Sequence, residues 1–370
     1  MQRNTAIDAV RGFAILLVMI GHCIVLNGLN EGDPYLYDMI KSVQMPLFML
    51  VSGVLAAMGV KRTGSGTGLK KLPARAASYL LPFFSWFVLV HVFVHLKSRT
   101  LSAGMFVKEL RDLLFQTDRG LWFLMTLFII TLCAMLAQTL ADRLLKKSTD
   151  ERKERVQCKK AGVFLVVSAL FYLLFFLQSH SANTFLSPSL TVQYFPFYLL
   201  GYLAGGYGQS LSVLLFPSQT TREKLGRAKP VAVALLAVVF VLLAVLDDLT
   251  APVTGMDVLM RQMLASFTGT VSCYSIVYGL AQRRQKKTEK RGFLSFIGLY
   301  TLEIYVLHFR FARILGLAEK GLCLYSLQGI LWIVLAFLLM SVLTGVSIMI
   351  LRRIPVLSFL LFGKKSTPQA

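Results

Sequence analysis

The chain has 370 residues, of which 56% are hydrophobic and only 15% are charged. Soluble domains average about 25% charged and about 45–50% apolar residues, so this composition argues against a soluble globular enzyme. The formal net charge is +21, which in a hydrophilic chain would indicate a nucleic-acid partner. Here the basic residues stand in short clusters between long apolar runs. This pattern is typical of a protein that crosses the lipid bilayer several times, and we expect no nucleic-acid partner.

Apolar stretches long enough to cross a bilayer recur along the whole chain. A bilayer core about 30 Å thick needs roughly 20 mostly apolar residues per helix. We therefore expect an all-α integral membrane protein, with residues 1–370 forming a single ten-helix domain. The expected spans are 6–27, 37–60, 78–96, 120–142, 161–179, 191–208, 229–247, 258–281, 293–315 and 327–351.

The basic clusters predict the orientation of these spans. Most lysines and arginines fall in alternate loops, among them a basic loop at 143–160, while the opposite loops include the acidic NEGDPYLYD and DDLTAPVTGMD. We therefore expect both termini in the cytoplasm. The connector at 97–119 is a basic exception on the outer side. Phe106, Leu110 and Leu113 recur there at helical spacing, so it is either an amphipathic surface helix or an ordinary connector.

Three polar side chains interrupt the first span: Asp8, Arg11 and His22. Each charge inside a span costs about 2.5–3.5 kcal/mol on insertion scales, so each needs an explanation. At about 100° per residue, the directions of Arg11 and His22 around the helix axis differ by only about 20°, so the two residues share a face. They lie about 16 Å apart along the axis. Asp8 precedes Arg11 at pairing distance. One interpretation is that Asp8 and Arg11 anchor the topology at the membrane interface and that His22 is a hydrogen-bonded packing residue. The other is that these three residues form a functional polar stripe, because a buried neutral imidazole is typical of a general base.

The ninth expected span carries a second polar concentration. Thr301, Tyr305 and His308 recur at i, i+4 and i+7 on one helical face. Glu303 and Arg310 stand seven residues apart and could pair across two turns. Helix packing is the alternative for the histidine and the tyrosine, whereas a carboxylate in the middle of a span requires a partner.

Other candidate sites are weaker. Gly53 and Pro46 in the second span are explained by close helix packing and a bend. His91 and His95 stand at i, i+4 but have no third ligand nearby in the sequence, so we expect no metal site. The GSGTG sequence at 64–68 lacks the flanking strand of a nucleotide-binding loop and predicts a flexible linker.

The segment RNTAIDAVRGFAILLVMIGH resembles the membrane-bound acyltransferase family 3, bacterial enzymes that O-acylate sugars and other exported acceptors. The family's first helix carries an arginine and a histidine separated by ten residues, matched here by Arg11 and His22, with the preceding acid matched by Asp8. The chain is most similar to stand-alone members of the fucose 4-O-acetylase type. Further similar segments follow in family order: MPLFMLVSG with Ser52, LWFL with Trp122, FPFYLLGYLAG, and LEIYVLHF with Glu303, Tyr305 and His308.

The resemblance implies transfer of an acyl group, most often acetyl, from cytoplasmic acyl-CoA to a sugar hydroxyl of an exported or cell-surface glycan. Acyl-CoA would be a co-substrate rather than a bound cofactor, and the protein would lie in a bacterial cell membrane. His22 would act as general base or briefly carry the acyl group, while Asp8 and Arg11 would orient the donor. The CoA phosphates would meet Lys70, Lys71 and Arg75, although Ser78 stands where the family often has a second arginine. The acceptor side would be lined by Glu303, Tyr305, His308, Trp122 and Ser52.

The alternative from another class is a ten-span secondary transporter or a lipid-linked glycan flippase, whose midplane polar residues would line a pathway. The sequence has neither an internal repeat nor paired broken helices, and both absences count against this reading.

Overall fold

The computed structural model describes residues 4–28, 35–63, 69–116, 121–145, 153–181, 184–215, 219–246, 249, 256–288, 291–315 and 323–363. Within these ranges every regular element is a helix, which confirms the expected all-α class for this part of the chain. In chain order the elements are α1 (Thr5–Val25), α2 (Tyr35–Thr63), η1 (Leu69–Lys71), α3 (Leu72–Ser98), α4 (Ala103–Phe115), α5 (Trp122–Leu144), α6 (Lys153–Ser179), α7 (Pro188–Gly206), α8 (Gly208–Leu215), α9 (Gln219–Leu246), α10 (Met256–Lys287), α11 (Phe293–Ile297), α12 (Thr301–Leu307), η3 (His308–Arg310), α13 (Leu327–Arg352) and α14 (Pro355–Phe362).

Among the described residues, eight helices are long and apolar enough to cross a membrane, and they match eight of the ten expected spans. They are Thr5–Val25, Tyr35–Val60, Leu69–Ser98, Trp122–Leu144, Glu154–Ser179, Glu223–Leu246, Asp257–Lys287 and Leu327–Arg352. Helices of this number and composition support a multi-pass membrane protein. The total of ten spans and the cytoplasmic side of both termini stay predictions.

The two other expected spans have different structures. The span at 191–208 corresponds to α7, a helix that is rich in tyrosine, proline and glycine and is not among the eight. The prediction of one continuous helix at 293–315 is wrong. The segment forms the short helices α11 and α12 and the 3₁₀ turn η3, because the chain turns at 298–300.

The chain divides into two compact units. The first comprises Met1–Val51 and Glu223–Ile350, and the second comprises Ser52–Arg222 and Leu351–Ala370. The three boundaries fall inside α2, near the start of α9 and near the end of α13, so none of them coincides with a loop. The expectation of a single domain over the whole chain stays a prediction.

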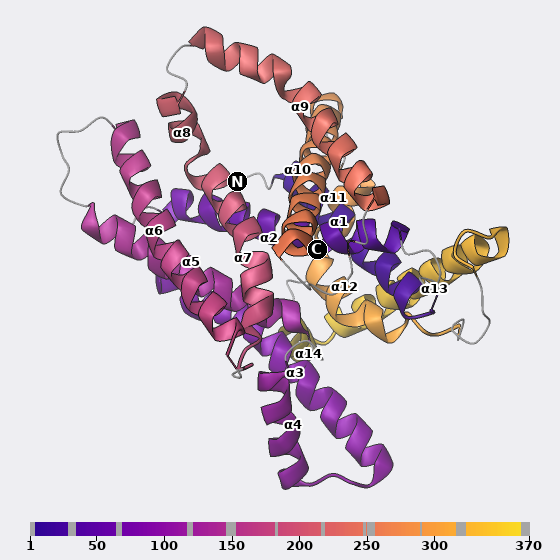
Figure 1. The fold of residues 1–370 in the computed structure, drawn as a ribbon. Helices are drawn as coiled ribbons and strands as arrows, with labels where there is room; N and C mark the ends of the chain where they lie inside the picture. Colours follow the sequence, from indigo (N-terminus) through magenta and orange to yellow (C-terminus); the bar gives the residue numbers. More distant parts are fainter. Residues whose placement is uncertain are drawn as a thin grey trace. The chain divides into compact units, whose positions relative to one another are not determined.

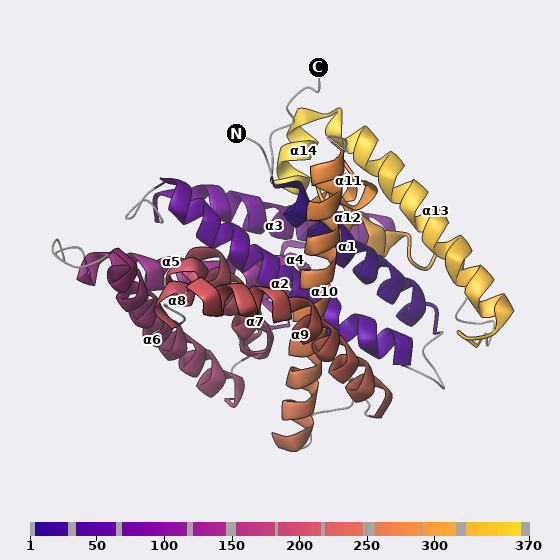
Figure 2. The same ribbon diagram turned by 90° about the horizontal axis from the view of Figure 1, so that it is seen from above.

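In the first unit, α1 packs against α10, α11 and α12 (Figures 1 and 2). Asn4 is the N-cap of α1, because its Oδ1 accepts hydrogen bonds from the backbone N–H groups of Ala6 and Ile7 at 3.1 and 3.2 Å. Two glycines allow α1 and α11 to approach closely. A Cβ on Gly12 would overlap the carbonyl oxygen of Leu294, and a Cβ on Gly298 would overlap the backbone of α1. The turn that breaks the ninth span therefore lies directly against α1.

The C-terminal turns of α1 belong to the apolar core of the first unit. This core brings together α1, α2, α13 and the segments on either side of residues 316–322. Its buried members are Met19, Cys23, Ile24, Ile40, Ala312, Leu324, Ala336 and Met340. Besides its polar stripe, α1 therefore has an apolar face that packs into this core.

In the second unit, α5, α6 and α7 lie side by side, and α3 packs on α5 and α14 (Figures 1 and 2). Gly53 packs where its Cβ would overlap the carbonyl oxygen of Tyr198, and a Cβ on Gly205 would lie 2.9 Å from the carbonyl oxygen of Val54. Close packing of α2 on α7 thus accounts for Gly53 as a structural residue, as expected.

The connector expected at 97–119 contains the helix α4, which begins after Ser102. The Oγ of this serine accepts a hydrogen bond from the backbone N–H of Met105 at 3.2 Å. Together α3 and α4 form a helical hairpin (Figure 1). The location of this connector on the outer membrane surface stays a prediction.

The basic loop expected at 143–160 is shorter than the sequence indicated, because α5 continues to Leu144 and α6 begins at Lys153. Residues 146–152 lie outside the described residues, as do the linker expected at 64–68 and most of the two acidic loops.

Candidate functional site

The polar stripe of α1 faces the segment that contains α12 and η3. Arg11 Nη1 lies 3.8 Å from Asp8 Oδ1, so the pairing expected from their spacing is present. Arg11 Nη2 also donates a hydrogen bond to the hydroxyl of Thr301, the first residue of α12. One guanidinium therefore links the buried carboxylate of α1 to α12.

Farther along the same face, His22 contacts His308. The two rings stack with centroids 5.0 Å apart and an interplanar angle of 19°, and His22 Nδ1 lies 2.8 Å from His308 Nε2. Phe309 packs edge-on against the His22 ring at 5.3 Å. Arg11 and His22 both face residues 301–308, which agrees with the shared helical face predicted by their eleven-residue spacing.

The hydrogen-bond network assigns the protons of this histidine pair. His308 Nδ1 lies 2.8 Å from the carbonyl oxygen of Ile304, which can only accept, so Nδ1 carries the proton of neutral His308. His308 Nε2 is then an acceptor, and it receives the Nδ1–H of His22. The Nε2 of His22 consequently keeps its lone pair. An imidazole with this tautomer and a fixed Nδ1–H has the arrangement of a general base or nucleophile.

Two further side chains hold the segment after η3 against the end of α1. The buried Asn27 donates from Nδ2 to the carbonyl oxygens of Cys23 at 2.8 Å and Ala312 at 2.9 Å. Arg313 Nε donates to the carbonyl oxygen of Leu26 at 3.0 Å. Sequence reasoning missed both positioning residues, because a single asparagine or arginine near a span end looks like an ordinary loop residue.

The remaining candidates on α12 are Tyr305 and Glu303. Tyr305 has its ring centroid 6.3 Å from that of His308. Glu303 is fully buried. The predicted face of Thr301, Tyr305 and His308 is therefore present although the long helix is not.

In the second unit, two of the three expected donor-binding residues, Lys70 and Lys71, lie in η1, and Arg75 lies in the first turn of α3. Arg75 Nη1 donates to the hydroxyl of Tyr79 at 3.2 Å, and Lys71 Nζ donates to the carbonyl oxygen of Gly59 at 3.4 Å. Lys70 is exposed. Ser78 Oγ donates a hydrogen bond to the carbonyl oxygen of Ala74 in the preceding turn of the same helix, at 2.9 Å. A serine is neutral, so it does not supply the charge that a second arginine would.

Trp122 and Ser52 also belong to the second unit. Trp122 begins α5 and stacks on Tyr194, with ring centroids 5.3 Å apart and an interplanar angle of 24°. Ser52 is half-buried in α2, one residue before the glycine that packs on α7. The roles of both residues stay predictions.

Comparisons with known proteins agree with this description. Residues 4–352 match a family model described as an acyltransferase domain. The nodulation protein NolL of Sinorhizobium fredii (strain NBRC 101917 / NGR234) is 30% identical over 139 residues, which are 35% of this chain and 36% of that protein. The match thus spans about a third of that relative's length. No solved structure matches the chain significantly. Because the family model covers nearly the whole chain, the protein belongs to the acyltransferase 3 family.

Proposed function

We propose that this membrane acyltransferase moves an acyl group, most often acetyl, from cytoplasmic acyl-CoA to a sugar hydroxyl of an exported or cell-surface glycan in a bacterial cell membrane. Membership of the acyltransferase family supports the reaction class. The observation that carries the mechanism is the His22–His308 pair, because it leaves the Nε2 lone pair of His22 for chemistry.

As general base, His22 would act on the acceptor hydroxyl. Its Nε2 takes the hydroxyl proton while the oxygen attacks the carbonyl carbon of the thioester. The carbon–sulfur bond then breaks, and the CoA sulfur leaves with the proton from Nε2, so that His22 returns to its starting state. His308 holds the Nδ1–H of His22 and stabilises the imidazolium that forms in between.

As acyl carrier, His22 would instead use the same lone pair on the thioester. Nε2 attacks the carbonyl carbon, the carbon–sulfur bond breaks and CoA leaves as a thiolate. The acceptor hydroxyl then takes the acyl group from the imidazole, and its proton passes to the CoA thiolate, which restores neutral His22. Both routes need the same tautomer, so His308 is a positioning residue in either case. This role differs from the acceptor contact that the resemblance implied for it.

The remaining roles follow the charges. Asp8 and Arg11 orient the donor from α1, and the cations Lys70, Lys71 and Arg75 bind the CoA phosphates, since guanidinium and ammonium groups recognise phosphate oxygens. The acceptor side is assigned to the polar and aromatic residues Glu303, Tyr305, Trp122 and Ser52.

The test uses purified protein in lipid nanodiscs with acetyl-CoA labelled in the acetyl group. The wild-type protein is expected to release CoA and to transfer label to a glycan acceptor, whereas His22→Ala and Arg11→Ala should each abolish transfer while still inserting and accumulating. The matched control is His180→Ala, which changes an exposed histidine in the turn that follows α6. Near-normal transfer by His22→Ala would overturn the mechanism. Transmembrane movement of a glycan by a wild-type protein that never consumes acetyl-CoA would favour the transporter or flippase.

A further inference from the structure

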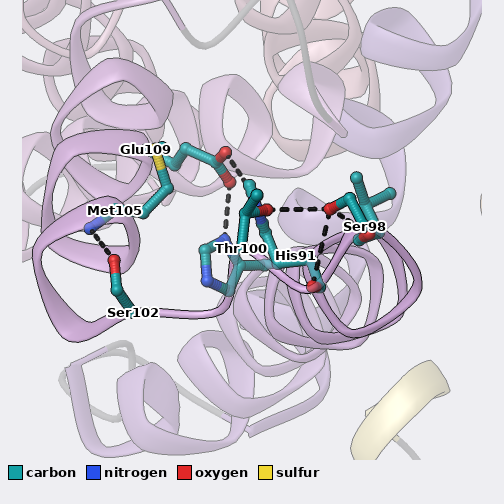
Figure 3. Close-up of polar contacts among 8 residues, drawn as sticks. His91, Ser98, Thr100, Ser102, Met105 and Glu109 are labelled. Carbon is teal, nitrogen blue, oxygen red and sulfur yellow. Dashed lines mark hydrogen bonds and ion pairs between the residues drawn. The ribbon is translucent and has the colours of Figure 1, made fainter.

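A second cluster of titratable side chains lies in the helical hairpin of α3 and α4, among residues that the acyl-transfer mechanism does not use. His91 Nδ1 lies 2.6 Å from one carboxylate oxygen of Glu109, and His95 Nε2 lies 2.6 Å from the other. The two imidazole rings have centroids 4.5 Å apart. Figure 3 shows Glu109 reaching from α4 toward the histidine side of α3.

Both histidines are buried, with 3% of His91 and 9% of His95 exposed. Phe106 of α4 packs edge-on against the His91 ring at 5.1 Å. The Nε2 of His91 is buried and makes no hydrogen bond to any described residue. Glu109, whose side chain is 36% exposed, forms the open side of the cluster.

A hydrogen-bond chain fixes the proton of His95. His95 Nδ1 lies 2.7 Å from the hydroxyl of Thr100, which lies 2.8 Å from the hydroxyl of Ser98, and Ser98 donates to the carbonyl oxygen of Val94 at 2.9 Å (Figure 3). Because the chain ends at a carbonyl, the arrangement that satisfies every contact has Thr100 donating to Ser98 and His95 donating to Thr100. The Nδ1 of His95 therefore carries a proton.

In a neutral His95, the Nε2 lone pair consequently points at a carboxylate oxygen 2.6 Å away. Two acceptors at that distance repel each other unless a proton or a cation lies between them. A metal ion that takes the place of the proton has two imidazole nitrogens and a carboxylate as ligands, a donor set typical of zinc sites that keep one open position. For His95, the hydroxyl of Thr100 is the kind of partner that metal-bound histidines usually have on their other ring nitrogen.

We propose that His91 Nδ1, His95 Nε2 and a carboxylate oxygen of Glu109 bind one divalent transition-metal ion of the Zn²⁺ class, with water as the fourth ligand. The three ligand atoms lie within 4.8 Å of one another. Zinc bonds of about 2.0–2.1 Å place tetrahedral ligand atoms roughly 3.3 Å apart. A nitrogen–oxygen contact of 2.6 Å therefore lengthens by about 0.7 Å on binding, a movement that the partly exposed Glu109 side chain allows.

Such an ion clamps α4 onto the end of α3. The chain reverses at Arg99, which has a left-handed φ of 56°, and α4 then runs back beside α3. Glu109 stands 14 residues beyond His95, so the spacing of the two histidines alone showed no third ligand.

The test is a Co²⁺ titration of the full-length protein, purified without a histidine tag and with its five cysteines replaced, because tetrahedral Co²⁺ has strong visible d–d absorption. One bound ion per chain is expected, displaced by Zn²⁺ at equal stoichiometry and counted by mass spectrometry of the metal. His91→Ala and Glu109→Gln should lose this stoichiometric binding. His180→Ala, at an exposed histidine of the same unit, should bind like the wild-type protein.

Thr100→Val is the sharper variant, because valine has nearly the same shape but removes the partner of His95 Nδ1. It should weaken Co²⁺ binding about 10–100-fold without changing the stoichiometry. Failure of the wild-type protein to bind Co²⁺ below millimolar concentration would overturn the proposal. So would binding that His91→Ala and Glu109→Gln retain, provided that both elute from size exclusion like the wild-type protein.

Discussion

At the scale of single residues, the histidine pair between α1 and η3 decides what His22 can do. A lone histidine in an apolar helix has two possible neutral tautomers, and only one of them presents Nε2 as a base. The carbonyl oxygen of Ile304 selects the tautomer of His308, which in turn selects that of His22. The tautomer that the proposed role of His22 requires is therefore selected through a backbone carbonyl contact that the sequence does not reveal.

The first prediction concerns His308. His308→Ala removes the acceptor of the His22 Nδ1–H, so the imidazole loses its fixed tautomer and the support for its protonated form. We expect kcat to fall about 10²–10⁴-fold, the range that general acid–base catalysis contributes, with the KM for acetyl-CoA changed much less. Steady-state kinetics in nanodiscs measure both constants.

His308→Gln is the conservative variant, because a carboxamide offers both an acceptor oxygen and a donor N–H group. It should recover part of the lost kcat, which a purely structural role for His308 would not explain. Equal activity of His308→Ala and the wild-type protein would contradict the assigned role.

At the scale of elements, the contact between α1 and α11 positions the whole polar stripe. The backbones meet at Gly12 and Gly298, where a side chain would overlap the opposite carbonyl groups. Ser295 Oγ adds a hydrogen bond to the carbonyl oxygen of Thr5 at 2.9 Å. Thr301 and His308 reach Arg11 and His22 because α12 follows directly from this contact.

Methyl groups at this contact provide the second prediction. Gly12→Ala or Gly298→Ala must push α11 away from α1, and overpacking of this kind costs about 1–3 kcal/mol of stability. We expect a lower melting temperature in detergent and a loss of acyl transfer, since the Arg11–Thr301 hydrogen bond would be displaced as well.

The control is Gly345→Ala in α13 of the same unit, where a Cβ would meet no other atom within 4 Å. It should leave the melting temperature unchanged or slightly raised, because alanine favours a helix more than glycine does. If all three variants behaved alike, close backbone approach would not be what positions α12.

At the scale of the whole molecule, the open question is how many segments cross the membrane. Eight described helices meet the length and composition of a span, and the basic clusters favour cytoplasmic termini. Whether α7 crosses the membrane decides the sides of the later loops. If it does not cross, one span is lost and every loop after α7 lies on the opposite side of the membrane.

Cysteine labelling tests this topology as the third prediction. In a cysteine-free background, Ser181→Cys stands before α7 and Thr220→Cys stands after it, and both positions are exposed. If α7 crosses the membrane as expected, a membrane-impermeant maleimide added to spheroplasts labels Ser181→Cys but not Thr220→Cys. A permeant maleimide must label both, and labelling of both by the impermeant reagent would show that α7 does not cross.

Hydropathy and spacing determined the features that depend on local composition. The apolar runs predicted the positions of eight long helices, and the angular spacing of Arg11 and His22 predicted their shared face. Both follow from the helix period and from the length that a bilayer requires, which need no knowledge of distant residues.

Tertiary structure alone decided the features that depend on residues far apart in the chain. The ninth span is broken at 298–300, where Gly298 lies against the backbone of α1, a contact that local hydropathy does not record. The tautomer of His22 depends on a partner 286 residues away. Glu109 joins His91 and His95 only because the chain reverses between α3 and α4. Composition sets which segments are helices, whereas the chemistry of each histidine depends on the atom that packing places against its ring.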